Sequence, residues 1–123
     1  MIIEVPPVTI TTDASGDATV YLGSKLRGRV HAIKYTAGTL DAGTDLVITG
    51  ETTGVAILTD SPAASEWFYP RAFPNKVTDG AAGTVPSEDV YVVNERIKVV
   101  VAQGGNVTTG TITAYIDTPV TPG

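Results

Sequence analysis

The fold class is decided by the stretch at residues 95–117, whose sequence is ERIKVVVAQGGNVTTGTITAYID. In its first part, 95–103, apolar side chains recur at every second position (Ile97, Val99 and Val101), which is the period of one face of a β-strand. Two glycines and an asparagine at 104–106 interrupt that run, and a second alternating run occupies 110–117. We expect two strands that pair as a hairpin and contribute to the core.

The composition favours sheet along the whole chain of 123 residues. Thr, Val and Ile dominate while Leu occurs five times, and β-branched side chains suit a pleated sheet better than a helix. Thirteen glycines and eight prolines divide the chain into short segments. The turn signals separate about seven to nine strands. The sequence therefore predicts a single all-β domain, an antiparallel β-sandwich or barrel with one long loop.

We divide the chain into an N-terminal arm at 1–7, a β domain at 8–117 and a C-terminal tail at 118–123. The first segment holds two consecutive prolines, which cannot donate hydrogen bonds to a neighbouring strand, so it forms an arm or an edge strand. The long loop covers 60–87 and holds four prolines. A loop of this length inside a compact domain is often functional.

Within the β domain, residues 8–12 and 18–22 are expected to form a hairpin, followed by a loop at 23–28. The run at 45–50 is so apolar that both of its faces are expected to be covered. Residues 55–59 should pair back on it.

Inside the long loop we expect a short helical turn near 61–66 and a short strand at 67–69. An extended excursion should follow at 75–86.

The composition also excludes several kinds of chemistry. The chain has no cysteine, which rules out disulfides and cysteine-based zinc sites. Its net charge is −5 and its eight basic residues are scattered, which argues against nucleic acid as a partner. No apolar run approaches the length of a membrane span, and the N-terminus lacks the pattern of a signal peptide. We therefore expect no membrane partner and synthesis in the cytoplasm of the producing cell.

Candidate catalytic and metal-binding residues each have a simpler structural explanation. His31 is the only histidine and lies in an expected strand, which favours packing or an interface over catalysis. Asp13, Ser15 and Asp17 resemble the first half of a calcium loop, but the second half is missing, so a turn is favoured. The acidic residues near strand ends, including Glu95, have the placement of solvated side chains. We predict no catalytic residue, no cofactor and no metal, and hence no enzyme.

The aromatic side chains of the long loop are the strongest candidates for function, because exposed aromatics serve protein interfaces and sugar-binding sites. The alternative is that they close one end of the sandwich. Apolar residues of the N-terminal segment also need cover, from their own domain or a neighbouring subunit. The predicted interface residues are Ile2, Ile3, Val5, Trp67, Phe68, Tyr69, Arg71 and Phe73.

Three segments, at 94–106, 28–35 and 45–54, occur in an order that resembles a family of small accessory head proteins of tailed bacteriophages, of the decoration (cement or minor capsid) type. The resemblance covers about residues 8–117. Its motifs are strands and turns, so they mark a fold and carry no chemistry. No catalytic or interface residue transfers from the family to this chain.

The resemblance implies a non-enzymatic structural protein of the virion, which binds the major capsid protein on the outside of the shell. Such proteins are usually oligomers, often trimers at local three-fold positions. Two alternatives remain at this point. One is another virion part, such as a head–tail joining, tail or fibre-associated protein. The other is a carbohydrate-binding β-sandwich module that uses Trp67 and Tyr69 as stacking platforms.

Overall fold

Nine β-strands make up the regular structure in the computed structural model, which describes residues 1–62 and 64–119. They are β1 (Ile2–Thr11), β2 (Ala18–Thr36), β3 (Asp45–Gly50), β4 (Ala56–Asp60), β5 (Glu66–Phe68), β6 (Arg71–Ala72), β7 (Glu88–Asp89), β8 (Tyr91–Ala102) and β9 (Thr109–Asp117). All strand pairs are antiparallel. The prediction of an all-β antiparallel fold is confirmed. The described part of the chain contains no helix that could cross a membrane.

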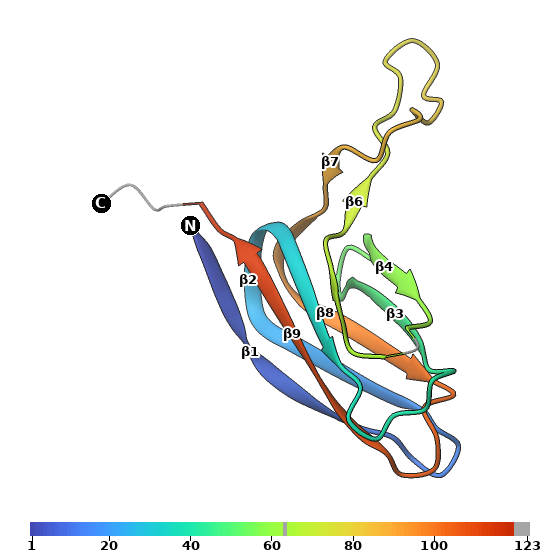
Figure 1. The fold of residues 1–123 in the computed structure, drawn as a ribbon. Helices are drawn as coiled ribbons and strands as arrows, with labels where there is room; N and C mark the ends of the chain where they lie inside the picture. Colours follow the sequence, from blue (N-terminus) through green and yellow to red (C-terminus); the bar gives the residue numbers. More distant parts are fainter. Residues whose placement is uncertain (63, 120–123) are drawn as a thin grey trace.

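The 19-residue strand β2 joins the two layers of the sandwich (Figure 1). Its first half pairs with β8, whereas its second half pairs with β9 on one edge and with β5 on the other. The register shifts between Leu22 and Arg27, a bulge that bends the strand from one layer into the other. The prediction of a loop at 23–28 is therefore wrong, since these residues belong to β2. Positive φ angles at Gly23 (72°) and Gly28 (125°) let the chain bulge without leaving the sheet.

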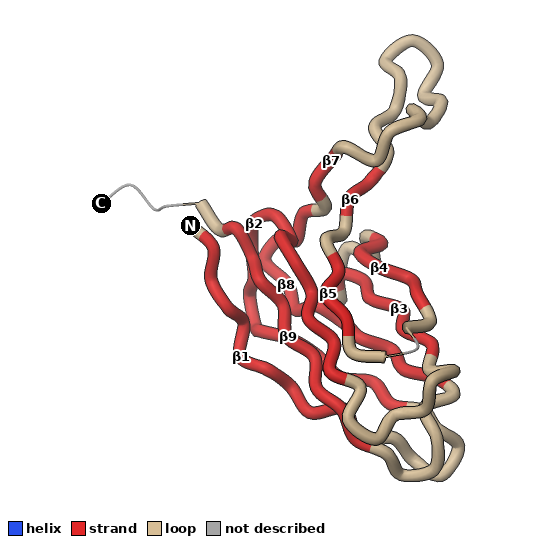
Figure 2. Tube along the Cα trace, in the orientation of Figure 1, coloured by secondary structure: helices blue, strands red, loops and turns tan. Residues whose placement is uncertain are grey.

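The core lies between a layer of β1, β9, β5 and the second half of β2, and a layer of β8, β3, β4 and the first half of β2 (Figures 1 and 2). Alternate side chains of each strand face inward, as the sequence pattern indicates. The buried side chains include Val5, Ile10, Leu22, Ile33, Tyr35, Leu46, Ile48, Ile97, Val99, Val101, Ile112, Ala114 and Ile116. Both long β-runs near the C-terminus contribute to this core, as predicted.

The two predicted hairpins do not form, although all four of their strands do. In the sheet order β1-β9-β2-β8-β3-β4, β2 separates β8 from β9, and β9 separates β1 from β2. The β1–β2 connection and the β8–β9 connection each cross from one layer to the other instead of turning back within a layer. The prediction that β3 and β4 pair is confirmed.

The two crossing connections stabilise each other at one end of the sandwich. The amide of Gly104 donates to the carbonyl of Gly16 (2.9 Å), and the amide of Val107 donates to that of Asp13 (3.1 Å). A Cβ atom at Gly16 would lie 2.9 Å from the Gly104 nitrogen, so only glycine permits this approach. The Asp13 carboxylate accepts the amides of Ser15 and Asp17, which gives the expected turn.

Three further expectations are tested by the strands. Val47 of β3 is 40% exposed, so only one face of that strand is covered, because no layer lies outside it. A helical turn was predicted near 61–66, but Glu66 belongs to β5. Ala63, in the middle of the predicted turn, lies outside the described residues. The short strand predicted at 67–69 is confirmed with a shift of one residue.

The N-terminal segment is an edge strand paired with β9 from Ile2 to Thr11. The register shifts between Val5 and Val8, where the two prolines interrupt the ladder. Val5 is 2% exposed and belongs to the core, so deletion of residues 1–7 would remove part of the sandwich. Of the predicted tail, residues 120–123 lie outside the described residues.

Glu95 is buried, contrary to the expectation of a solvated carboxylate. It is 3% exposed and accepts hydrogen bonds from the amides of Thr52 and Thr53 in the β3–β4 turn and from the amide of Val93 in its own strand. Asn94 between them has a φ of 52°, and the Glu95 carboxylate accepts from the Val93 amide at 3.1 Å. The sequence offers no sign of this contact, since Thr53 and Glu95 are 42 positions apart along the chain.

We expect Tyr35→Phe to raise the free energy of unfolding by about 1 kcal/mol. The Tyr35 hydroxyl is buried and makes no hydrogen bond of normal geometry with any described residue. Burial raises the pKa of this phenol, and the nearby Thr44 hydroxyl, which donates its own proton to the Asp41 carbonyl, offsets this only in part. Urea denaturation of both proteins measures the difference. A loss of stability on removing the oxygen would show that the hydroxyl is hydrogen-bonded in solution.

Candidate interaction site

An arm formed by residues 71–89 projects from one end of the sandwich (Figures 1 and 2). At its base β6 pairs with β7 through Arg71 opposite Asp89. Further out, the amide of Lys76 donates to the Ala81 carbonyl (2.8 Å). The outgoing and returning segments of the arm also pair in the bridge between Asn75 and Ala82. The excursion predicted at 75–86 is thus the outer part of this arm, in which the chain runs out and returns alongside itself.

The arm presents apolar side chains that no other described part of the chain covers. Phe73 is 51% exposed, Val85 63%, and Val77 fully so. None of the buried core residues in the described chain lies between 73 and 87. These side chains therefore add little to the stability of the sandwich and are available to a partner.

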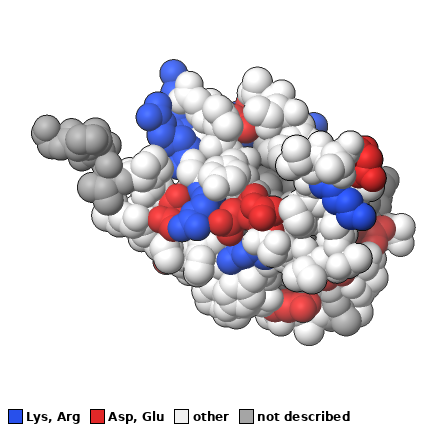
Figure 3. Space-filling view, turned by 90° about the horizontal axis from the view of Figure 1, so that it is seen from above, with Lys and Arg blue, Asp and Glu red and all other residues white. Residues whose placement is uncertain are grey.

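A chain of alternating charges ties the base of the arm to the sheet. Asp89 lies between Arg71 (Nε–Oδ1, 3.4 Å) and Arg29 (Nη1–Oδ2, 3.0 Å). Arg29 continues to Asp117, its cross-strand neighbour on β9, and the Met1 amine contacts the same carboxylate at 3.0 Å. Basic and acidic atoms lie side by side when the molecule is seen from above (Figure 3). The charge pairs thus connect the base of the arm to the sheet, while the β6–β7 ladder joins the two sides of the arm.

The charge pairing also sets the electrostatics of the site. Hydrogen bonds from the Met1 amine and from Arg29 lower the pKa of Asp117. A lowered pKa means that this carboxylate stabilises the fold at neutral pH, and that its contribution disappears as the pH falls through the lowered value. The same pairing raises the pKa of Arg29, which stays charged throughout. Because these side chains are partly exposed, solvent screens their interactions.

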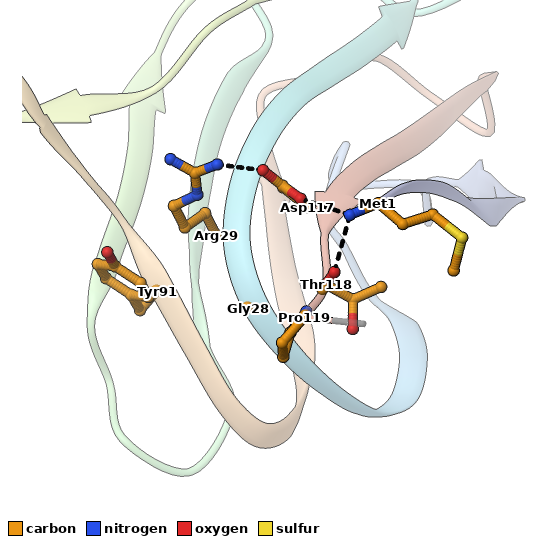
Figure 4. A pocket seen from close by; sticks show the side chains of 7 residues that line it. All are labelled: Met1, Gly28, Arg29, Tyr91, Asp117, Thr118 and Pro119. Atoms are coloured by element: carbon orange, nitrogen blue, oxygen red, sulfur yellow. Dashed lines mark hydrogen bonds and ion pairs between the residues drawn. The ribbon is translucent and has the colours of Figure 1, made fainter. Parts of the chain in front are cut away.

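Two hollows flank the Arg29–Asp117 pair. The first, of 510 Å³, is lined by Met1, Gly28, Arg29, Tyr91, Asp117, Thr118 and Pro119 (Figure 4). A Cβ atom at Gly28 would lie 2.3 Å from the Asp117 carbonyl oxygen, so glycine is required for β9 to approach here. The second, of 300 Å³, is lined by Ile2, Arg29, His31, Arg71, Asp89 and Asp117. It lies where the arm joins the sheet.

The structure separates the predicted aromatic residues into different environments. Trp67 is 45% exposed and packs against Tyr115, with ring centroids 5.2 Å apart. Phe68 points the other way and packs on the core. Tyr69 is exposed and lies edge-on to the His31 ring at 6.3 Å. Phe73 belongs to the arm and stays apart from the other three.

The remaining predicted interface residues are similarly divided. Ile2 is exposed at the smaller hollow, beside Arg71, while Ile3 and Val5 pack inward. The structure thus brings Ile2 and Arg71 together with His31, and it places Tyr69 next to that group.

Three residues that meet here were not brought together by the sequence argument: Arg29, Asp117 and Asp89, which was interpreted as a solvated acid near a strand end. Asp89 lies 60 positions from Arg29 along the chain and Asp117 lies 88 positions from it, so no local spacing connects them. Only the pairing of β2 with β9 brings Arg29 beside Asp117. These contacts could have been recognised from the sequence only if the register between β2 and β9 had been known. Within residues 1–62 and 64–119, no group of three or more His, Asp or Glu side chains is placed to hold a metal ion.

Comparisons of the chain with protein-family models, with curated proteins and with solved structures gave no match.

Proposed function

We propose that this protein is an accessory structural component of a tailed-phage virion, which decorates the head by binding the outer surface of the major capsid protein shell. The sequence resemblance over residues 8–117 supports this proposal. So does a rigid antiparallel body, which can carry an exposed attachment element without reactive groups. On this proposal the protein has no enzymatic activity, and it reaches the capsid surface after synthesis in the host cytoplasm.

The arm is the observation that carries the proposal. The arm extends away from the sandwich (Figure 1), and its exposed side chains Phe73, Val77 and Val85 are not part of the buried core. A preformed projection loses little conformational entropy when it binds, so apolar contacts at its tip convert efficiently into affinity. An element of this kind suits attachment between neighbouring subunits of a shell, which demands contact area and no chemistry.

We further propose that the protein acts as an oligomer, with a trimer favoured by the resemblance. Several arms on one particle bind the same shell with avidity, so each contact can be modest. The net charge of −5 would also disfavour adhesion to packaged DNA.

Mass spectrometry and cryo-microscopy of purified virions of the phage that encodes this chain test the proposal. We expect copies distributed over the whole capsid surface, with density for the arm in contact with the major capsid protein. Copies confined to a single vertex or to the tail would instead support a joining, tail or fibre-associated role. Absence of the protein from virions would contradict the proposal altogether.

A further inference from the structure

The smaller hollow at the base of the arm has the form of a ligand site. Five strands contribute to its wall, which consists of Ile2 from β1, Arg29 and His31 from β2, Arg71 from β6, Asp89 from β7 and Asp117 from β9. Its volume of 300 Å³ is at the lower end of the range for small-molecule sites, about 300–1,000 Å³. It therefore suits one compact unit more than an extended chain.

The charges on the wall are balanced. Two guanidinium groups, Arg29 and Arg71, face two carboxylates, Asp89 and Asp117, so a strongly charged ligand would gain little net attraction. Mutual pairing does not exhaust these groups. An arginine carries five N–H donors and a carboxylate about four acceptor positions. Arg71 Nη1 already donates to the Pro70 carbonyl at 2.6 Å, but Asp89 Oδ1 has only a 3.4 Å contact with Arg71. The wall thus presents fixed donors beside fixed acceptors.

The rim of the hollow adds apolar surface. Ile2 lines the hollow and is 52% exposed. Tyr69, which is 60% exposed, lies beside the hollow and stands edge-on to its lining residue His31. Aromatic rings offer flat, weakly polar faces with a hydroxyl at the edge. A ligand that matches this wall carries adjacent hydroxyl groups, no net charge and an apolar C–H face.

We propose that this hollow binds one neutral hexose unit of a glycan. Adjacent sugar hydroxyls donate to Asp89 and accept from Arg71, while the C–H face of the ring packs against Tyr69. This binding activity is additional to capsid attachment and does not depend on it. The unit can come from a free saccharide or from a surface polysaccharide, because the recognised chemistry is the same.

Saturation-transfer NMR tests the proposal with the methyl glycosides of glucose, galactose, mannose and N-acetylglucosamine as probes. We expect the wild-type protein to bind at least one of them, and Tyr69→Ala and Asp89→Asn to weaken that binding by about tenfold or more, which corresponds to about 1.4 kcal/mol. Phe73→Ala is the matched control, since it removes an exposed aromatic outside the hollow. Amide spectra of each variant verify that it is folded. Should Asp89→Asn disturb the arm, Tyr69→Ala still tests the proposal, because it leaves the charge pairs intact.

A glycan array then distinguishes a single sugar unit from a preferred polysaccharide. Failure of the wild-type protein to bind any of the four glycosides would overturn the proposal. So would equal binding by Tyr69→Ala, or tighter binding of glucuronate than of glucose. Val77→Ser and Val85→Ser, at exposed arm residues outside the hollow, are expected to lose head occupancy but to bind the sugar as the wild type does, so loss of attachment and loss of sugar binding remain separable.

Discussion

Replacement of Glu95 by alanine is expected to lower the free energy of unfolding by about 3 kcal/mol. The carboxylate is buried and accepts hydrogen bonds from the amides of Thr52 (2.9 Å), Thr53 (3.0 Å) and Val93 (3.1 Å), and from the Thr53 hydroxyl (2.9 Å). Alanine would leave three backbone donors without their acceptor at the β3–β4 turn. Gly50 is adapted to this contact, because a Cβ atom there would lie 2.6 Å from Glu95 Oε1.

The same carboxylate should make stability depend on pH. Burial raises the pKa of Glu95, but the hydrogen bonds from Thr53, Val93 and Thr52 outweigh that effect, so the folded pKa lies below the ordinary value. The stabilisation is present above the ordinary glutamate pKa and is lost as the pH falls through the folded pKa. Glu95→Gln, which keeps an acceptor but no charge, should lose less stability than alanine and should weaken this acid dependence.

Urea denaturation at neutral and acidic pH measures both effects. Glu88→Ala is the matched control, since Glu88 is an exposed acid in β7 and should change stability by less than about 0.5 kcal/mol. If Glu95→Ala proved as stable as Glu88→Ala, the contact with the β3–β4 turn would not exist in solution.

Replacement of the outer arm by a tight turn should abolish attachment to heads without unfolding the sandwich. In this variant an Asn-Gly pair, the preferred sequence of a two-residue hairpin, replaces residues 73–87 and joins Ala72 directly to Glu88. No buried core residue of the described chain is removed, so the free energy of unfolding should change by about 1 kcal/mol or less. Occupancy on capsids should fall by more than about tenfold, because the exposed anchors are lost.

Point substitutions separate the arm's apolar contacts from its length. Phe73→Ser, Val77→Ser and Val85→Ser should each reduce occupancy on heads that lack the native protein, measured by quantitative gel analysis after sedimentation. Val47→Ser is the control, since it removes an exposed valine from β3, on the body of the sandwich. Full occupancy by the turn variant would show that another surface binds the shell.

The positions of the strands and of their inward-facing side chains follow from local sequence patterns. Alternation along 95–103 and 110–117 is a local property, and both runs occupy the expected strands β8 and β9, with the expected side chains buried. The positive φ angle at Asn94 is equally local, since asparagine tolerates this conformation better than most residues. The extended excursion in the long loop followed from its prolines and glycines.

The pairing of the strands, and hence the contacts between distant side chains, could be learned only from the three-dimensional fold. Alternation is the same whether a strand turns back on its neighbour or crosses to the opposite layer, so the two predicted hairpins were wrong. The bulge in β2 sends that strand into both layers, and the resulting register places Arg29 beside Asp117 across 88 positions. The buried Glu95 and the hollow beneath the arm follow from the same pairing, because contacts between distant segments depend on register and burial and leave no local pattern.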